Sequence, residues 1–85
     1  MSEIKINPKR VYQVHAYGEG FSLKGSMQGG GFKSLTDCVV KVINGTAKLS
    51  DVRYVAILDV KSMQSACYKV ILCKDRKEGF MLVAY

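Results

Sequence analysis

The second half of the sequence contains three apolar segments, residues 53–60, 66–73 and 79–85, which are rich in β-branched and aromatic side chains. This composition is typical of β-strands. The polar stretches that separate them, 61–65 and 74–78, have the length of hairpin connections. Because consecutive strands joined by short connections run antiparallel, the pattern predicts a three-stranded antiparallel meander.

A hairpin is expected before the meander. Residues 11–17 have the composition of a strand, and residues 21–27 alternate apolar with polar side chains, as a strand with one wet face does. The short glycine-containing connection at 18–20 joins the two. Residues 28–31 are expected to form a flexible break after the hairpin.

A helix is predicted to begin near Leu35. Ser34 is a suitable N-cap, and Asp37 three positions later approximates a capping box. Gly45 stands where a C′ glycine would end the helix. Apolar side chains at helical spacing form one stripe that faces the core, and this stripe consists of Leu35, Val39, Val42 and Ile43.

The predicted fold class is α+β: an antiparallel sheet of about five strands with one helix packed on one face, in the order β-β-α-β-β-β. Residues 1–85 are expected to form a single domain. Both faces of the strands at 53–60 and 79–85 are apolar, whereas one short helix covers only one face. The other face must be covered by sheet curvature, by a second copy of the chain or by a partner.

The last expected strand reaches Tyr85. At an edge of the sheet, its free backbone groups could pair with another chain, which would give a homodimer or a complex. Inside the sheet, the same groups would be used by neighbouring strands.

The composition limits the chemistry of the chain. His15 is the single histidine, and Cys38, Cys67 and Cys73 contain no C-x-x-C pair. We therefore expect no catalytic residues, no metal and no cofactor, and we expect the cysteines to be reduced core thiols. No segment approaches the ~20 apolar residues of a membrane helix, and the first residues lack the apolar core of a signal peptide. A cytoplasmic protein without membrane contact is expected.

Positive charge is in excess, with 13 Lys and Arg residues against 7 Asp and Glu residues and a net charge of +6. Such an excess is the footprint of an anionic partner, but it is also an ordinary solubility charge. If the first strand starts at the end of the sheet where the last hairpin turns, the cations at 9–10 and 74–77 form one cluster. The basic residues expected to bind a partner are Lys9, Arg10, Lys24, Lys33, Lys74, Arg76 and Lys77.

Aromatic side chains on the sheet face away from the helix would provide anchors for a partner or the seam of a homodimer. Tyr17 and Phe21, together with Tyr12, could also stack on unpaired bases. The aromatic residues expected to bind a partner are Tyr12, Tyr54, Tyr68 and Tyr85.

The complete layout is a hairpin, a helix opened by Ser34-Leu35-Thr36-Asp37 and a meander that runs to residue 85. In this layout, nearly the whole chain resembles the small proteins that bacteriophages use against host systems, including several anti-CRISPR proteins. The resemblance is one of architecture and carries no functional residue onto this sequence. It implies a non-catalytic inhibitor that acts in the host bacterial cell.

The leading hypothesis is therefore a phage or mobile-element protein that occupies a surface on a host protein or nucleoprotein complex, such as a CRISPR effector. The alternative is a small basic module that binds DNA or RNA without a protein partner. A third hypothesis is an enzyme or ligand-binding protein that uses His15 or a cysteine.

Overall fold

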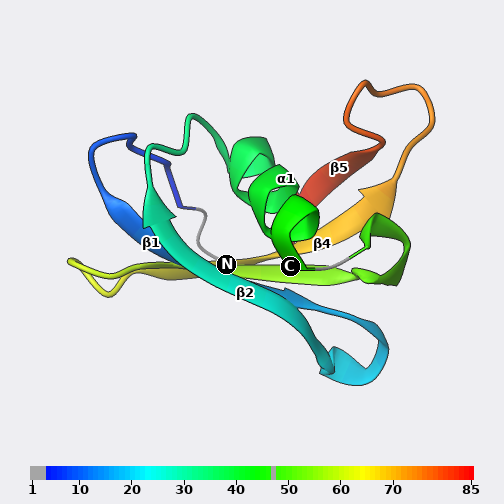
Figure 1. The fold of residues 1–85 in the computed structure, drawn as a ribbon, viewed down its shortest axis with the longest axis horizontal. Helices are drawn as coiled ribbons and strands as arrows, with labels where there is room; N and C mark the ends of the chain where they lie inside the picture. Colours follow the sequence, from blue (N-terminus) through cyan, green and yellow to red (C-terminus); the bar gives the residue numbers. More distant parts are fainter. Residues whose placement is uncertain (1–3, 47) are drawn as a thin grey trace.

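The hairpin, the helix and the meander predicted from the sequence are all present (Figure 1). The computed structural model describes residues 4–46 and 48–85. Within them, two short 3-10 turns, η1 (Glu19–Phe21) and η2 (Leu49–Asp51), accompany one helix, α1 (Leu35–Thr46), and the strands β1 (Val11–Tyr17), β2 (Leu23–Gly30), β3 (Tyr54–Asp59), β4 (Ser65–Leu72) and β5 (Phe80–Ala84).

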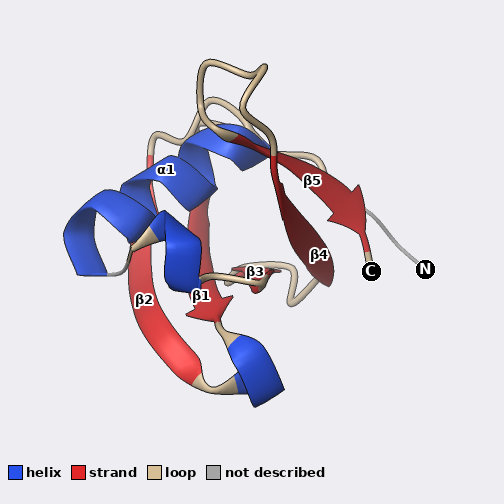
Figure 2. Cartoon of the chain, turned by 90° about the vertical axis from the view of Figure 1, so that its right-hand side faces the viewer, coloured by secondary structure: helices blue, strands red, loops and turns tan. Residues whose placement is uncertain are grey.

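The strands form one antiparallel sheet in the order β2-β1-β3-β4-β5. β1 pairs with β3 although β2 and α1 lie between them in the sequence. α1 crosses one face of this sheet, as Figure 2 shows. The predicted α+β class, with one helix on a five-stranded antiparallel sheet, is confirmed.

The core lies between α1 and the sheet. Val39 and Val42 of the predicted helix stripe are fully buried in the core cluster, which also contains the inward side chains of β1 and β3. Leu35 and Ile43, at the margins of the stripe, are half-buried and pack on the same cluster. Burial alternates along both strands, because successive side chains of a strand point to opposite faces.

The helix begins at Leu35, as predicted, but it does not end at Gly45. Ser34 Oγ accepts a hydrogen bond from the Asp37 N–H at 3.1 Å, and the Asp37 carboxylate accepts one from the Lys33 N–H at 3.0 Å. Gly45 lies inside α1, which continues to Thr46, and lacks the positive φ of a C′ glycine.

The second strand also differs from its predicted bounds. Gly20 and Phe21 adopt positive φ angles of 69° and 58°, so neither can belong to the strand, and β2 starts at Leu23. The strand then continues to Gly30, through most of the predicted flexible break, because Gly29 and Gly30 pair with β1.

Tyr12 and Tyr68 were expected on the face away from the helix, and this placement is wrong. Both are buried on the helix side, where their hydroxyl groups hold the segment before β1. The Tyr68 hydroxyl accepts the Ile4 N–H at 2.9 Å, and the Tyr12 hydroxyl accepts the Asn7 N–H at 2.8 Å. Each tyrosine fills the core with its ring and uses its hydroxyl to satisfy backbone that α1 does not cover.

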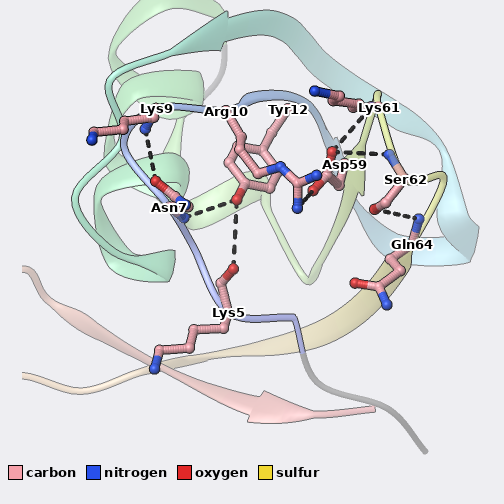
Figure 3. Close-up of polar contacts among 9 residues, drawn as sticks. All are labelled: Lys5, Asn7, Lys9, Arg10, Tyr12, Asp59, Lys61, Ser62 and Gln64. Atoms are coloured by element: carbon pink, nitrogen blue, oxygen red, sulfur yellow. Dashed lines mark hydrogen bonds and ion pairs between the residues drawn. The ribbon is translucent and has the colours of Figure 1, made fainter.

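Asp59, at the end of β3, connects the meander to the start of β1 (Figure 3). Its side chain is 3% exposed and accepts hydrogen bonds from the backbone N–H groups of Lys61 at 3.0 Å and Ser62 at 3.3 Å. The Arg10 guanidinium forms an ion pair with the second carboxylate oxygen at 3.2 Å. The carboxylate therefore shapes the β3–β4 turn and neutralises Arg10.

Desolvation would raise the pKa of Asp59, but the N–H groups of Ser62 and Lys61 and the charge of Arg10 outweigh it, so the pKa lies below its ordinary value of 3.8. A carboxylate with a lowered pKa stabilises the fold above its ordinary pKa, and this contribution disappears as the pH falls through the folded-state value.

We therefore expect Asp59→Asn to lower the melting temperature at pH 7 and to weaken its dependence on pH below 3.8. Thermal unfolding followed by circular dichroism over this pH range measures both effects. Asp75→Asn, at an exposed position of the β4–β5 turn, is the control and should retain the wild-type profile. If the melting temperature of Asp59→Asn fell with pH below 3.8 as steeply as that of the wild type, Asp59 would not be the group responsible.

Candidate partner-binding surface

The face of the sheet opposite α1 carries no covering element among the described residues. Antiparallel register places side chains of β1, β3, β4 and β5 side by side in rows across this face. We call it the open face, and it consists of Gln13, His15, Tyr17, Tyr54, Ala56, Leu58, Cys67, Lys69, Ile71, Met81, Val83 and Tyr85.

The exposed part of the open face is mainly apolar toward β5. Tyr85 is 48% exposed, Val83 42% and Met81 37%, and Ile71 beside them on β4 is also exposed. Single exposed apolar side chains are normal, but adjoining ones mark an interaction site. The apolar character of both faces of the last strand was visible in the sequence, so this part of the surface could be predicted.

Three aromatic rings gather on the open face from different parts of the chain. Phe21 of η1 stacks on Tyr54 of β3, with ring centroids 4.5 Å apart and planes inclined by 20°. Tyr85 completes the group edge-on, 5.1 Å from Tyr54 and 6.2 Å from Phe21. We call these residues the aromatic cluster, and together they form one partly exposed group of rings.

The backbone is strained where it presents Phe21. This residue is 52% exposed and has a φ of 58°, a left-handed conformation that costs a bulky L-residue about 1–2 kcal/mol. Gly18 makes the turn possible, because a Cβ there would lie 2.7 Å from the Asp51 carbonyl oxygen of η2. Strained backbone with an exposed apolar side chain is typical of functional positions.

Of the four tyrosines expected to bind a partner, Tyr54 and Tyr85 lie on the open face, whereas Tyr12 and Tyr68 belong to the core. Phe21 takes their place in the aromatic cluster. The alternating pattern of 21–27 predicted Phe21 inside a strand, and only the paired glycines around Glu19 indicated a turn that could carry it.

The expected basic residues are divided between the two ends of the sheet. Because β1 is antiparallel to β3 and β3 to β4, the start of β1 lies at the end opposite the β4–β5 turn. The condition under which the cations at 9–10 and 74–77 would form one cluster is therefore not met. Lys9, Arg10 and Lys33 lie at one end, and Lys24, Lys74, Arg76 and Lys77 lie at the other.

The end where β1 begins carries two hollows with cationic walls. One, of about 260 Å³, is lined by Lys9, Arg10, Val11, Val60 and Lys61. The other, of about 450 Å³, is lined by Ile4, Lys5, Ile6, Lys33, Ser34 and Leu35. Carboxylates already occupy two anion-binding features here, since Asp59 pairs with Arg10 and the Asp37 carboxylate accepts the Lys33 N–H at the start of α1. This end of the sheet therefore supplies positive charge beside the open face, but it does not form a preorganised anion-binding site.

The candidate reactive groups do not converge. Burial raises the pKa of the Cys38 thiol to about 12, with the charge of Asp37 as a second cause, and burial also raises the pKa of Cys67. His15 lies 3.4 Å from the Tyr17 hydroxyl and is separated from Cys67 by β3, which corresponds to about 10 Å across the sheet. No group of three potential metal ligands occurs within residues 4–46 and 48–85.

Compared with protein-family models, curated proteins and solved structures, the chain matches none. In the part of the chain that the structure describes, no helix is long and apolar enough to cross a membrane.

The strained backbone at Phe21 predicts that a glycine variant at this position is more stable than an alanine variant. Both Phe21→Ala and Phe21→Gly remove the stacked ring, but only glycine relieves the positive φ. We expect Phe21→Gly to be more stable than Phe21→Ala by about 1 kcal/mol, as measured by urea unfolding. In ordinary extended or helical backbone alanine is the more stable of the two, so an alanine variant of equal or higher stability would contradict the strained conformation.

Proposed function

We propose that this protein is a non-catalytic binding protein that attaches to a partner through its open face. The aromatic cluster of Phe21, Tyr54 and Tyr85 supports this proposal most strongly. Exposed aromatic rings that are already held in place lose little conformational entropy on binding, and they are typical hot spots of interfaces. The three rings come from separate parts of the chain and contact one another, so the fold brings them together as one group.

The charge of the chain favours a partner with an acidic surface. Lys69 lies within the open face between Tyr54 and Val83, and free cations stand at both ends of the sheet. Complementary charge would accelerate association and would make binding weaken as salt rises.

We further propose, from the resemblance in layout, that the chain is a phage or mobile-element inhibitor acting in the bacterial cytoplasm. Its partner would be a host protein or nucleoprotein complex that handles nucleic acid, such as a CRISPR effector. The cations would meet acidic side chains of the complex or phosphate groups of its nucleic acid.

A second candidate function is the direct binding of single-stranded nucleic acid. The observation that favours it is the combination of Tyr54, Tyr85 and Lys69 on one sheet face, since unpaired bases stack on exposed aromatic rings beside cations. This function requires no protein partner.

Affinity capture from bacterial lysate tests the proposal, with nuclease-treated and untreated samples run at low and high salt. One defined protein complex, retained after nuclease, is expected. Retention should fall at least about tenfold for Tyr85→Ala and for Phe21→Gly, because each removes a central aromatic contact. Met63→Ala is the control, since Met63 is an exposed apolar residue in the β3–β4 turn and is not part of the open face. Equal losses in all three variants would reject the open face.

The nucleic-acid alternative has its own test. If the chain binds DNA or RNA directly, everything retained should be lost on nuclease treatment, and the purified protein should bind oligonucleotides. Changing Lys74, Arg76 and Lys77 together to Gln should then weaken binding and reduce its salt dependence. An unchanged salt dependence would exclude the β4–β5 turn from the nucleic-acid contact.

A further inference from the structure

β5 is an edge strand whose outward backbone groups can be identified. The Tyr85 N–H donates to the Cys67 carbonyl at 3.0 Å, and the Cys73 N–H donates to the Gly79 carbonyl at 2.9 Å. In an antiparallel pair, alternate residues point their N–H and C=O groups toward the same neighbour. The residues at 79, 81, 83 and 85 therefore bond to β4, and those at 80, 82 and 84 direct their backbone groups to the edge of the sheet, where no strand of the described residues pairs with them.

This edge lacks the features that usually prevent strand pairing. Between Phe80 and Ala84 there is no proline and no charged side chain, and the register with β4 is continuous. The opposite edge, β2, differs in each respect that matters: it contains Lys24 and three glycines, and its register with β1 shifts at Ala16/Tyr17. Natural proteins blunt exposed edges with charge, bulges or glycine, so the regular, apolar edge of β5 is the one suited to a partner strand.

We propose that β5 pairs antiparallel with β5 of a second copy of this chain, about a two-fold axis at Leu82. In that register, Leu82 faces Leu82 of the second copy, and Phe80 faces Ala84 of the second copy. Each such pair exchanges two N–H···O bonds, so every outward backbone group of the edge finds a partner. The outward residues are placed symmetrically about Leu82, which makes the strand complementary to itself, as an isologous dimer interface requires.

The same register fixes the side-chain contacts on the open face. Met81 lies directly opposite Val83 of the second copy, and both are exposed apolar side chains in the single chain. Cross-strand neighbours of this kind approach to about 5 Å, so dimerisation removes part of the apolar surface from water. The sheets of the two copies become continuous, and their open faces lie side by side.

Charges at these two positions test the register. In the wild type, sedimentation velocity should detect a particle of twice the 9.4 kDa chain mass. Met81→Glu with Val83→Glu places like charges opposite each other across the seam and should raise the dimer dissociation constant at least about tenfold. Within one chain Val83 faces the exposed Lys69, so a glutamate at position 83 does not strain the fold.

A second pair of substitutions separates this register from a general loss of apolar surface. Met81→Lys with Val83→Glu places opposite charges across the same contacts and should restore the dimer. The control, Ser26→Glu with Gln28→Glu, adds the same charge on the β2 edge and should remain dimeric. A wild type that stays monomeric at every soluble concentration would overturn the proposal. Equal dissociation of the two double variants at positions 81 and 83 would also overturn it, and so would dissociation of the β2 control. Circular dichroism checks that each variant is folded.

Discussion

One helix must cover five strands, and the rest of the structure follows from this constraint. A 12-residue helix is about 18 Å long, and a sheet of five strands is about 19 Å wide. Because a helix is only about 10 Å thick, α1 cannot cover the whole sheet. It lies closest to β1 and β2, as Figure 2 shows. On the side of the sheet that α1 covers, the strands far from the helix need another covering segment. The opposite side of the sheet receives no cover from α1 at all.

On the side of the sheet that carries α1, the segment before β1 provides further cover in place of a second helix. Ile4 is buried in the core, and the hydroxyls of Tyr68 and Tyr12 accept the N–H groups of Ile4 and Asn7. Arg10 then pairs with the buried Asp59 where β1 begins. Burying a carboxylate is favourable only where its charge and lone pairs are satisfied, so this contact strongly specifies the β1–β3 pairing that makes the sheet continuous.

Local patterns predicted the elements because they depend on neighbouring residues: β-branched and aromatic composition indicated most strands, alternation indicated the strand at 21–27, and Ser34 with Asp37 indicated the helix start. The strand order was not predictable, since β1 and β3 meet only after the hairpin and helix intervene. The strand order determines which basic side chains lie at the same end of the sheet and on which face each tyrosine lies. Tyr12 and Tyr54 have the same composition signal, yet one is core and the other surface, because alternation within a strand does not say which face the helix covers.

The two proposed contacts of the molecule share only Met81 and Val83, because they use different directions of the sheet. Strand pairing at β5 uses backbone groups in the plane of the sheet, whereas the aromatic cluster projects perpendicular to it. A dimer formed through Leu82 would leave Phe21 and Tyr54 available and would hold two aromatic clusters on one continuous face. A partner with repeated subunits could engage both, and the second contact would form at a high effective concentration. A small chain with a modest interface per copy would thereby reach tighter binding than its own surface allows, which explains why an unprotected edge and an uncovered face can be useful in the same protein.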